Sequence, residues 1–568
     1  MSWILAVIGI LGMVSCTGET APKVEEVPAD SALMAHSNEF RREMIEVTHG
    51  VYVAVGFGLA NCVLLEGKNG VIIVDTMESA EAAADVKEAF RRITAKPVKA
   101  IIYTHYHPDH TFGASVMAGT DRPDIYSHAD TLKHLDRIVN VTRDITYKRG
   151  MRQFGTFLPK EAFINAGIGP SLRFDSSNTP AMLRPTRTFA GEKLELDIEG
   201  IHLILLHAPG ETPDQTVVWM PAKKVLLPAD NYYKSFPNLY AIRGTAYRDV
   251  LMWVASLDMM RNLGAAYLVP HHSRPVIGDE TIYQTLTNYR DAIQYVHDQT
   301  VRCMNKGFTP DEIVEKVKLP PHLASLPYLR EYYGTVAWSV RAIFDGYLGW
   351  FSGNATDLFP LPVLERAKRF TELAGGEQAL LEKAKKAFQG EAFQWVLELT
   401  DQLIRVNPDL EEARELKAEA LAKLAAMQTA ATGRNYYLTQ ALEFRRQLSI
   451  GRAGTQFPEF VHSIPLDAIF DAMTVNLNPE KSAAVDTVAG FRFTDTGDTY
   501  TLHVRRGVVE VRHGFPEKPD LTVTVDSRIW KEIIAGIRNP ALALVKDVKK
   551  EGGTINLIRF LRLFKTED

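Results

Sequence analysis

A short histidine-rich segment limits the possible structures of this chain more than any other feature. The segment THYHPDH at residues 104–110 directly follows an apolar run, residues 98–103, that has the pattern of a buried strand. Three imidazoles and a carboxylate on a loop supported by a strand can converge on one point. Imidazole and carboxylate ligands together suit zinc. A solvated polar loop, the alternative interpretation, does not account for the spacing H-x-H-x-D-H, so we expect a metal site.

The surrounding region, residues 44–275, alternates short strand-like runs with helical patterns. Residues 79–93 place Ala83, Val86 and Phe90 on one face, which predicts a helix. Strands precede this helix, and a second set follows the histidine-rich segment. The expected strands cover residues 51–55, 61–65, 70–75, 98–103, 201–206, 216–220, 224–227 and 266–269. Two sheets with helices outside them is the simplest architecture for this order.

The chain of 568 residues is too long for one hydrophobic core, and about 150 residues per domain predicts three or four domains. Residues 281–307 have helical periodicity, and residues 377–427 read as two amphipathic helices joined at Asn407 and Pro408. That pair resembles a single tetratricopeptide hairpin, which does not make a repeat array. A last, α+β domain is expected, with strands at 490–494, 499–505, 508–512 and 520–525 and helices at 529–537 and 541–548.

The first residues have the pattern of an export signal. An apolar run at residues 3–14 ends on small residues before Cys16. The boundary resembles a bacterial lipobox, in which that cysteine is lipidated, although an ordinary cleaved signal peptide fits the run as well. We expect an exported protein, either periplasmic or anchored to the membrane through Cys16. The expected division is a signal peptide at 1–16, a linker at 17–40, and domains at 41–280, 281–450 and 451–568.

Composition excludes several classes of protein. The net charge of −5 offers no basic field for nucleic acid. The cysteines, Cys16, Cys62 and Cys303, are too few for a disulfide framework and lack C-x-x-C spacing. The apolar run at the start is too short for a membrane span followed by further topology. A polytopic membrane protein, a disulfide-stapled miniprotein and a disordered chain are therefore excluded.

The histidine-rich segment resembles the signature of the metallo-β-lactamase fold superfamily. Asp75, at the end of an expected strand, matches that superfamily's buried structural aspartate. The resemblance implies two zinc ions, with His105, His107 and Glu211 on the first, Asp109, His110 and His272 on the second, and Asp230 bridging them. His202 and His207 are rivals of Glu211, and we favour Glu211 because it lies inside the turn motif HAPGETPD at 207–214.

A glutamate in place of the usual histidine resembles the zinc-dependent alkyl sulfatases. Further segments resemble the same family: FPNLYAIRG at 236–244, HHSRP at 271–275, YGTV at 333–336 and YLGWF at 347–351. The resemblance implies a metallo-β-lactamase αββα sandwich, an all-helical dimerisation domain and a sterol-carrier-protein-like α+β C-terminal domain. One departure concerns Asp230, because that family commonly bridges its metals with glutamate.

The resemblance implies a zinc-dependent alkyl sulfatase that hydrolyses long-chain esters of the dodecyl sulfate type to alcohol and sulfate. Zinc lowers the pKa of bound water from 15.7 to roughly 7, which provides hydroxide at neutral pH. Asp109 and Asp230 would orient that nucleophile in addition to holding metal. Arg243 would bind the sulfate, because a guanidinium donates two parallel hydrogen bonds to an oxyanion. A surface arginine in a turn is the alternative for Arg243.

Two other functions compete with this one. The first is another hydrolase of the same fold, such as a lactonase, β-lactamase or phosphoesterase. The second is a lipid-binding lipoprotein with a vestigial metal site. The helical region is expected to form a homodimer, although an exposed aromatic run containing Tyr328, Tyr332, Tyr333 and Trp338 could instead roof the active site. The C-terminal domain could hold the apolar tail of the substrate or be purely structural.

Overall fold

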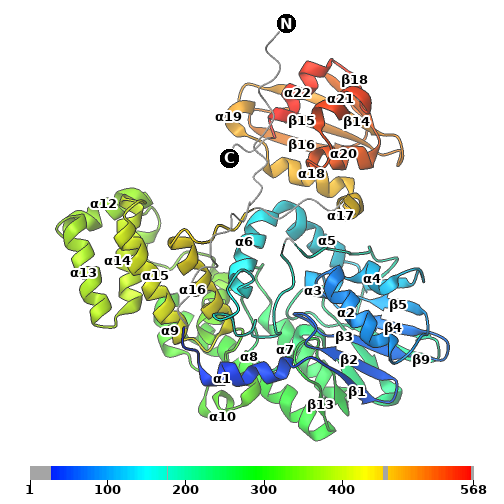
Figure 1. Ribbon diagram of the computed structural model, residues 1–568, viewed down its shortest axis with the longest axis horizontal. Helices are drawn as coiled ribbons and strands as arrows, with labels where there is room; N and C mark the ends of the chain where they lie inside the picture. The colour runs from blue at the N-terminus through cyan, green and yellow to red at the C-terminus, as the bar shows by residue number, and fades with distance from the viewer. Residues whose placement is uncertain (1–26, 176, 452–457, 565–568) are drawn as a thin grey trace.

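The computed structural model describes residues 27–175, 177–451 and 458–564. The expected signal peptide and Cys16 lie outside the described residues. No helix within the described part combines the length and the apolar character that a membrane span requires. Figure 1 shows the chain as a blue-to-green sandwich, a green-to-yellow set of helices and an orange-to-red domain above them.

The sandwich consists of two sheets. The seven-stranded sheet runs in the order β1 (Glu43–Thr48), β2 (Val51–Val55), β3 (Cys62–Glu66), β4 (Val71–Val74), β5 (Val98–Ile102), β6 (Asp124–His128) and β7 (Arg187–Phe189). The six-stranded sheet runs in the order β13 (Val276–Ile277), β12 (Tyr267–Leu268), β11 (Val225–Leu227), β10 (Thr216–Met220), β9 (Ile201–His207) and β8 (Lys193–Ile198). Each of the eight strands expected in this domain forms, within a residue or two of its expected bounds.

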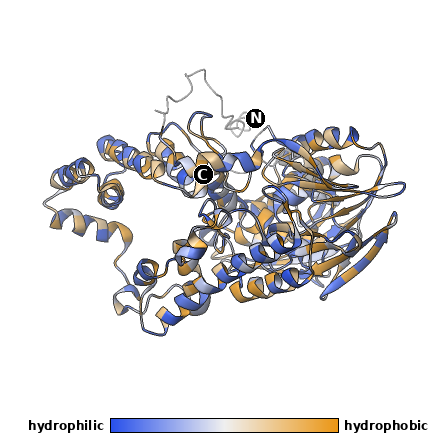
Figure 2. Ribbon diagram, turned by 90° about the horizontal axis from the view of Figure 1, so that it is seen from below, coloured by the Kyte–Doolittle hydropathy of each residue, from blue (hydrophilic) through white to orange (hydrophobic). Residues whose placement is uncertain are grey.

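The core has three apolar layers, one between the sheets and one outside each sheet. Val53 and Ile72 face Leu205 and Val218 across the inner layer. Helices α2 (Ala80–Arg91) and α4 (Ala114–Ala118) cover the outer face of the first sheet, and α7 (Val250–Asn262) and α8 (Asp279–Met304) cover the second. In Figure 2 the strands are mostly hydrophobic, whereas the outer helices alternate in character. This αββα arrangement confirms the expected fold class.

The parallel strands at the centre of the sandwich bring the polar loops to one edge. β4 pairs parallel with β5, and β11 pairs parallel with β12. Asp75 follows β4, the histidine-rich segment follows β5, Asp230 follows β11, and His272 follows β12. Because the carboxyl ends of parallel strands meet at one edge of a sheet, loops distant in sequence converge there.

The middle of the chain is helical, as expected. After α8 come α9 (Pro310–Lys316), α10 (Pro321–Ala324), α11 (Val336–Leu348), α12 (Val363–Leu373), α13 (Glu377–Gln389), α14 (Phe393–Val406), α15 (Glu411–Ala426) and α16 (Ala431–Phe444). The expectation of two helices across 377–427 is wrong, because three form. The first expected helix is interrupted at 390–392, where Glu391 takes a positive φ of 56° that a helix cannot contain.

The C-terminal domain is an α+β unit around one five-stranded sheet. The strand order is β16 (Val508–His513), β15 (Thr499–Arg505), β14 (Asp486–Phe493), β17 (Leu521–Val525) and β18 (Lys549–Glu551). The helices include α18 (Leu466–Val475), α20 (Ser527–Ile534), α21 (Pro540–Lys546) and α22 (Thr554–Arg562). α18 packs against η2 (Arg137–Val141), a π-helix that joins α5 (Thr131–Asp136) to α6 (Arg143–Phe154) of the sandwich domain.

Part of the segment assigned to a linker has regular structure. α1 (Ser31–His36) and η1 (Ser37–Phe40) occupy the last ten positions of the expected linker at 17–40. Asp30 caps α1 by accepting hydrogen bonds from the backbone N–H groups of Ala32 and Leu33. Leu33 is fully buried against Tyr332 and Ala431 of the helical region. The segment therefore connects the helical region to the sandwich.

Candidate metal centre

Four loops at one edge of the sandwich deliver the predicted ligands. His105 and His107 lie on the loop after β5, and Asp109 and His110 lie in the short helix α3 (Pro108–Thr111) that continues it. The remaining predicted ligands are Glu211 between β9 and β10, Asp230 in η4 (Ala229–Asn231) and His272 after β12. All seven side chains are buried or nearly so.

Six of these seven residues form two groups suited to metal ions. His105, His107 and Asp230 make one group, and Asp109, His110 and His272 make the other. Within each group the ligand atoms lie within 4.8 Å of one another. Compared with the predicted ligand sets, Glu211 is in neither group and Asp230, predicted to bridge the two metals, is a member of the first. Two adjacent clusters of imidazole and carboxylate groups are a ligand set suited to a pair of zinc ions.

Asp230 lies between the two groups. Its Oδ2 atom is 3.6 Å from His105 Nε2, 3.4 Å from His110 Nε2 and 3.2 Å from His272 Nε2. One carboxylate thus contacts an imidazole of the first group and two of the second. A carboxylate in this place could be shared by two metals, and the bridging role of Asp230 stays a prediction.

Unpaired polar atoms in the two groups fit the binding of a cation. His110 Nε2 and Asp230 Oδ1 are buried and have no hydrogen-bond partner among the described residues. Burial lowers the pKa of His105 to about 3, which keeps that imidazole neutral. Burial acts against ionisation of Asp230 as well, but the neighbouring His272 and His110 outweigh it and hold the pKa of Asp230 well below its usual range. A neutral His105 imidazole and an ionised Asp230 carboxylate are protonation states of metal ligands. At His110 and His272 burial acts to lower the pKa, but the neighbouring Asp230 carboxylate outweighs it and raises the pKa of both imidazoles.

A second layer of contacts orients these ligands. Asp75 Oδ2 accepts a hydrogen bond from His110 Nδ1 at 2.7 Å, and Asp75 Oδ1 accepts one from the Thr104 N–H at 2.8 Å. His272 Nδ1 donates to the Leu59 carbonyl at 2.9 Å. These contacts place the proton of each imidazole on Nδ1 and turn Nε2 towards the cluster, as outer partners of metal-binding histidines do. Asp75 therefore has the structural role expected of it.

Glu211 is buried beside the two groups but belongs to neither. Its Oε1 atom is 3.0 Å from Arg248 Nη1, and its Oε2 atom accepts a hydrogen bond from the Tyr233 hydroxyl at 3.3 Å. Burial raises the pKa of Glu211, and the Arg248 guanidinium opposes this effect. Its role as a ligand stays a prediction.

The two rival histidines face other partners. His207 Nε2 lies 2.8 Å from the Pro213 carbonyl, and its ring stacks on His128 with the centroids 4.1 Å apart. His202 Nδ1 lies 3.1 Å from Asp197 at the surface. Neither rival is in a ligand group, and the partners of both lie outside those groups.

The Arg243 side chain points at the ligand groups rather than at solvent. Its Nη2 atom donates to His107 Nε2 at 3.0 Å, and its buried Nη1 atom has no hydrogen-bond partner among the described residues. Helix α6 holds the backbone around it. Gln153 Oε1 accepts from the Arg243 N–H at 2.9 Å, and Arg149 donates to the adjacent Ile242 carbonyl at 2.6 Å from Nη2.

Sequence reasoning did not assign a role to two other buried charged groups. Arg248 is 4% exposed, and its Nε and Nη2 atoms have no hydrogen-bond partner among the described residues. Glu78 accepts from the backbone N–H of Leu59, whose carbonyl orients His272, and burial raises the pKa of Glu78 to about 7. Arg248 follows the segment at 236–244 closely, which is a signal that could have identified it. Glu78 has no such signal.

The aromatic run of the helical region is less exposed than expected. Tyr332 and Tyr333 are buried, so the expectation of an exposed aromatic run is wrong for both. The Tyr333 ring packs edge-on against Tyr233, with the centroids 5.7 Å apart. Tyr233 in turn hydrogen-bonds to Glu211, so Tyr333 places part of the helical region beside the candidate centre.

Three family models match successive parts of the chain. The model described as the metallo-beta-lactamase superfamily matches residues 55–272. The model described as alkyl sulfatase dimerisation matches residues 309–447, and the model described as alkyl sulfatase C-terminal matches residues 455–568. Together they cover the three parts seen in the structure, in the same order.

Similar proteins match over most of the chain. A linear primary-alkylsulfatase from Pseudomonas sp. (strain ATCC 19151) is 39% identical over 89% of this chain and 98% of its own length. An (R)-specific secondary-alkylsulfatase from Pseudomonas sp. is 28% identical over 91% of this chain and 80% of its own. The solved structure of the stereoselective inverting sec-alkylsulfatase Pisa1 from Pseudomonas sp. aligns with a TM-score of 0.88 at 25% identity, over 95% of this chain and 87% of that one.

Proposed function

Because this chain belongs to the alkylsulfatase family of metallo-β-lactamase-fold enzymes, we propose that it hydrolyses long-chain alkyl sulfate esters of the dodecyl sulfate type, releasing alcohol and sulfate. One observation carries the proposal beyond the family. The Arg243 guanidinium lies 3.0 Å from His107, one of the predicted metal ligands, and its Nη1 atom is buried without a partner among the described residues. A cation directed at a hydrolytic centre suits an anionic substrate.

Two zinc ions are the proposed cofactors, held by the residues of the two groups with Asp230 between them and Glu211 beside them. When bound, zinc would supply a nucleophile at neutral pH, because it lowers the pKa of water to roughly 7. The chain's own groups have separate tasks. Asp109 and Asp230 offer carboxylate oxygens that accept hydrogen bonds and orient the attacking water. Arg243 binds the sulfate and offsets the negative charge that moves towards it.

The substrate is tested by measuring sulfate release from primary alkyl sulfates of increasing chain length and from matched secondary esters. We expect turnover of dodecyl sulfate and none of nitrocefin or an acyl-homoserine lactone. Hydrolysis in ¹⁸O-water shows which bond breaks, because label in the sulfate means S–O cleavage and label in the alcohol means C–O cleavage. A purified, zinc-loaded protein that hydrolyses the lactone but no alkyl sulfate would replace this proposal with another hydrolase of the fold.

Metal content is a separate measurement. Elemental analysis of the purified protein should give about two zinc ions per chain. A zinc content near zero in a folded protein, together with retained binding of dodecyl sulfate, would favour a lipid-binding protein with a vestigial site.

The helical region is proposed to form a homodimer, because residues 309–447 match a family model described as a dimerisation domain. Light scattering of the purified protein should give twice the mass of the chain.

Export is proposed from the sequence alone, on the apolar run at residues 3–14 and Cys16. Mass spectrometry of the mature N-terminus distinguishes a lipidated Cys16 from an ordinary cleaved signal peptide.

A further inference from the structure

The helical region carries an exposed apolar segment, which we call the apolar arm and define as residues 348–364, from the end of α11 into the first turn of α12. Phe359 is 94% exposed and Trp350 is 73% exposed. The arm also contains the following exposed apolar residues: Leu348, Leu358, Leu361, Val363 and Leu364. Single exposed apolar side chains are ordinary, but seven of them within 17 residues are the composition of an interaction surface.

The conformation of the arm suits docking as an extended ligand. Pro360 and Pro362 flank Leu361, so two φ angles are restricted and two backbone N–H groups are absent. Pro362 has φ −50° and ψ 141°, close to the polyproline II region. Such a segment cannot extend a sheet, but it binds in aromatic-lined grooves at a small cost in conformational entropy.

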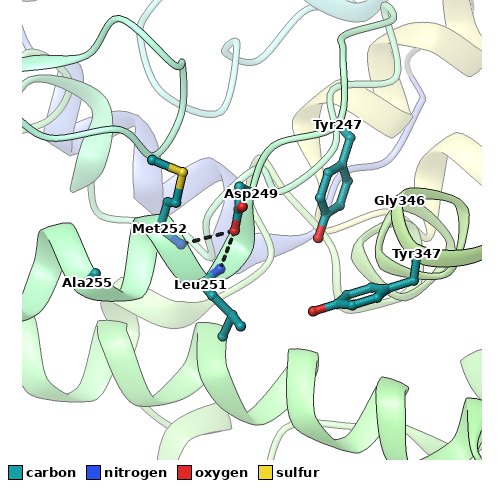
Figure 3. Close-up of a pocket in the computed structure, with 7 residues that line it drawn as sticks. All are labelled: Tyr247, Asp249, Leu251, Met252, Ala255, Gly346 and Tyr347. Carbon is teal, nitrogen blue, oxygen red and sulfur yellow. Dashed lines mark hydrogen bonds between the residues drawn. The ribbon is translucent and has the colours of Figure 1, made fainter.

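A groove of that kind lies at the junction of the sandwich and the helical region. It has a volume of about 420 Å³ and is bounded by Tyr247, by Leu251 and Met252 of α7, and by Tyr347 of α11. In Figure 3 the two tyrosines stand on one side of the groove and the side chains of α7 on the other. These four side chains are between 42% and 50% exposed, so the groove is open in the single chain. We call it the tyrosine groove.

The walls of the tyrosine groove are fixed in place. The Tyr247 ring lies directly against Gly346, where any side chain would collide with it. The Tyr347 hydroxyl hydrogen-bonds to His297 Nε2 at 2.8 Å, and His297 is buried in α8. Asp249 caps α7 through the N–H groups of Leu251 and Met252, both at 3.1 Å. A groove with preset walls loses little freedom when it is filled.

We propose that the apolar arm of one copy of this chain docks in the tyrosine groove of a second copy. The inference rests on the proposed homodimer and names its contact. The arm does not fill the groove of its own chain, since Phe359 is almost fully exposed while that groove is open. The match to the dimerisation model includes both the arm and Tyr347, so the contact is continuous with that domain. A two-fold axis makes the exchange reciprocal, which buries both arms and both grooves.

Cross-linking between two differently tagged chains tests the contact. One chain carries Phe359→Cys and the other Met252→Cys, and the two are co-expressed and treated with a short bismaleimide. We expect a covalent dimer that contains both tags. Wild-type chains, which keep Cys303, provide the background. A dimer by light scattering that gives no doubly tagged product above this background would overturn the proposal. So would a cross-link found only within one chain when both substitutions are combined.

A charge substitution provides the second measurement. Phe359→Asp should raise the dimer dissociation constant at least about 30-fold, as the loss of one interface hot spot does. Val508→Asp, at a 59% exposed position in β16 of the C-terminal domain, is the matched control and should leave the constant unchanged. An unchanged constant with Phe359→Asp, or a monomeric wild-type protein, would overturn the docking proposal. Sulfate release is assayed in the same samples, so a wild-type dimer without sulfatase activity contradicts the proposed reaction alone.

Discussion

Arg248 Nη1 lies 3.0 Å from Glu211 Oε1, and both side chains are buried beside the metal-ligand groups. Tyr233 donates to the other carboxylate oxygen of Glu211 at 3.3 Å. The negative charge of Glu211 therefore has a partner supplied by the chain itself, independent of any metal. This pairing links the segment that carries Arg243 to the loop between β9 and β10.

Arg248→Met should destabilise the protein, because it leaves the Glu211 carboxylate buried without a counter-charge. Removing one member of a buried ion pair costs about 3–5 kcal/mol. Thermal unfolding of the metal-free protein measures the loss. If Glu211 also binds zinc, the loss should be smaller in the zinc-loaded protein, because the cation replaces the missing charge. The double variant Arg248→Met/Glu211→Leu should recover much of the lost stability. Equal melting temperatures for the wild type, Arg248→Met and the double variant would show that the pair is not coupled.

His107→Ala should lose zinc and activity together while the protein stays folded. His107 supplies one of the three ligand atoms of its group. His207 lies outside both groups and hydrogen-bonds to the Pro213 carbonyl. His207→Ala is therefore the matched control and should keep its zinc. We expect a fall of at least about 100-fold in sulfate release for His107→Ala, measured beside elemental zinc analysis. Zinc loss in His207→Ala with full zinc in Glu211→Ala would transfer the role of Glu211 to His207.

Arg243→Ala should weaken binding and turnover of sulfate esters without changing zinc content. A charge-assisted bidentate contact in a partly desolvated site contributes about 2–4 kcal/mol, or on the order of 30- to 1000-fold in kcat/KM. Arg243→Lys should restore only part of the loss, since an ammonium keeps the charge but not the planar fork. A neutral ester offers no sulfate for Arg243 to bind. Hydrolysis of any neutral ester that the enzyme accepts should therefore change little in the Arg243 variants. Equal losses on neutral and sulfated substrates would mean that Arg243 is structural.

Gln153 is expected to act as a positioning residue for Arg243. It is fully buried, and its Oε1 atom accepts from the Arg243 backbone N–H at 2.9 Å. Gln153→Leu removes this acceptor, so Arg243 is held less firmly in its place. KM for alkyl sulfates should rise by about 3- to 30-fold, the effect of one lost buried hydrogen bond. Gln153→Glu keeps an acceptor and should restore most of the affinity. A fall in kcat with unchanged KM, or the same effect in a variant that already lacks the Arg243 side chain, would rule out this role.

His36 should make the folded state sensitive to acid. Burial lowers the pKa of His36 to about 4, although its hydrogen bond to the Gly167 carbonyl at 3.0 Å partly opposes this shift. In the unfolded chain His36 binds its proton near pH 6.5. The contribution of neutral His36 to the free energy of unfolding is therefore complete above pH 6.5 and is lost as the pH falls towards 4. The loss reaches about 3 kcal/mol. Urea unfolding of the wild type and His36→Gln at pH 7.5 and 4.5 measures it, and a parallel decline in both proteins would exclude His36.

Sequence reasoning predicted most of the local structure because periodicity is a local property. Alternating and continuous apolar runs identified the strands of both sheets, and the histidine-rich segment identified four ligand candidates at once. It was wrong where one backbone angle decides the outcome. The break between α13 and α14 depends on the positive φ of Glu391, which no apolar pattern signals.

The partners of the site residues were decided by tertiary structure. The Arg243 backbone meets Gln153 across 90 residues of sequence, and His272 meets the Leu59 carbonyl across 213. Such contacts arise because parallel strands bring their loops to one edge and because α6 and the helical region close over that edge. The sequence by itself therefore determined the elements, their order and the ligand types of this protein. Packing alone decided that Glu211 pairs with Arg248 and that Tyr333 is buried, because those contacts join segments with no common local pattern.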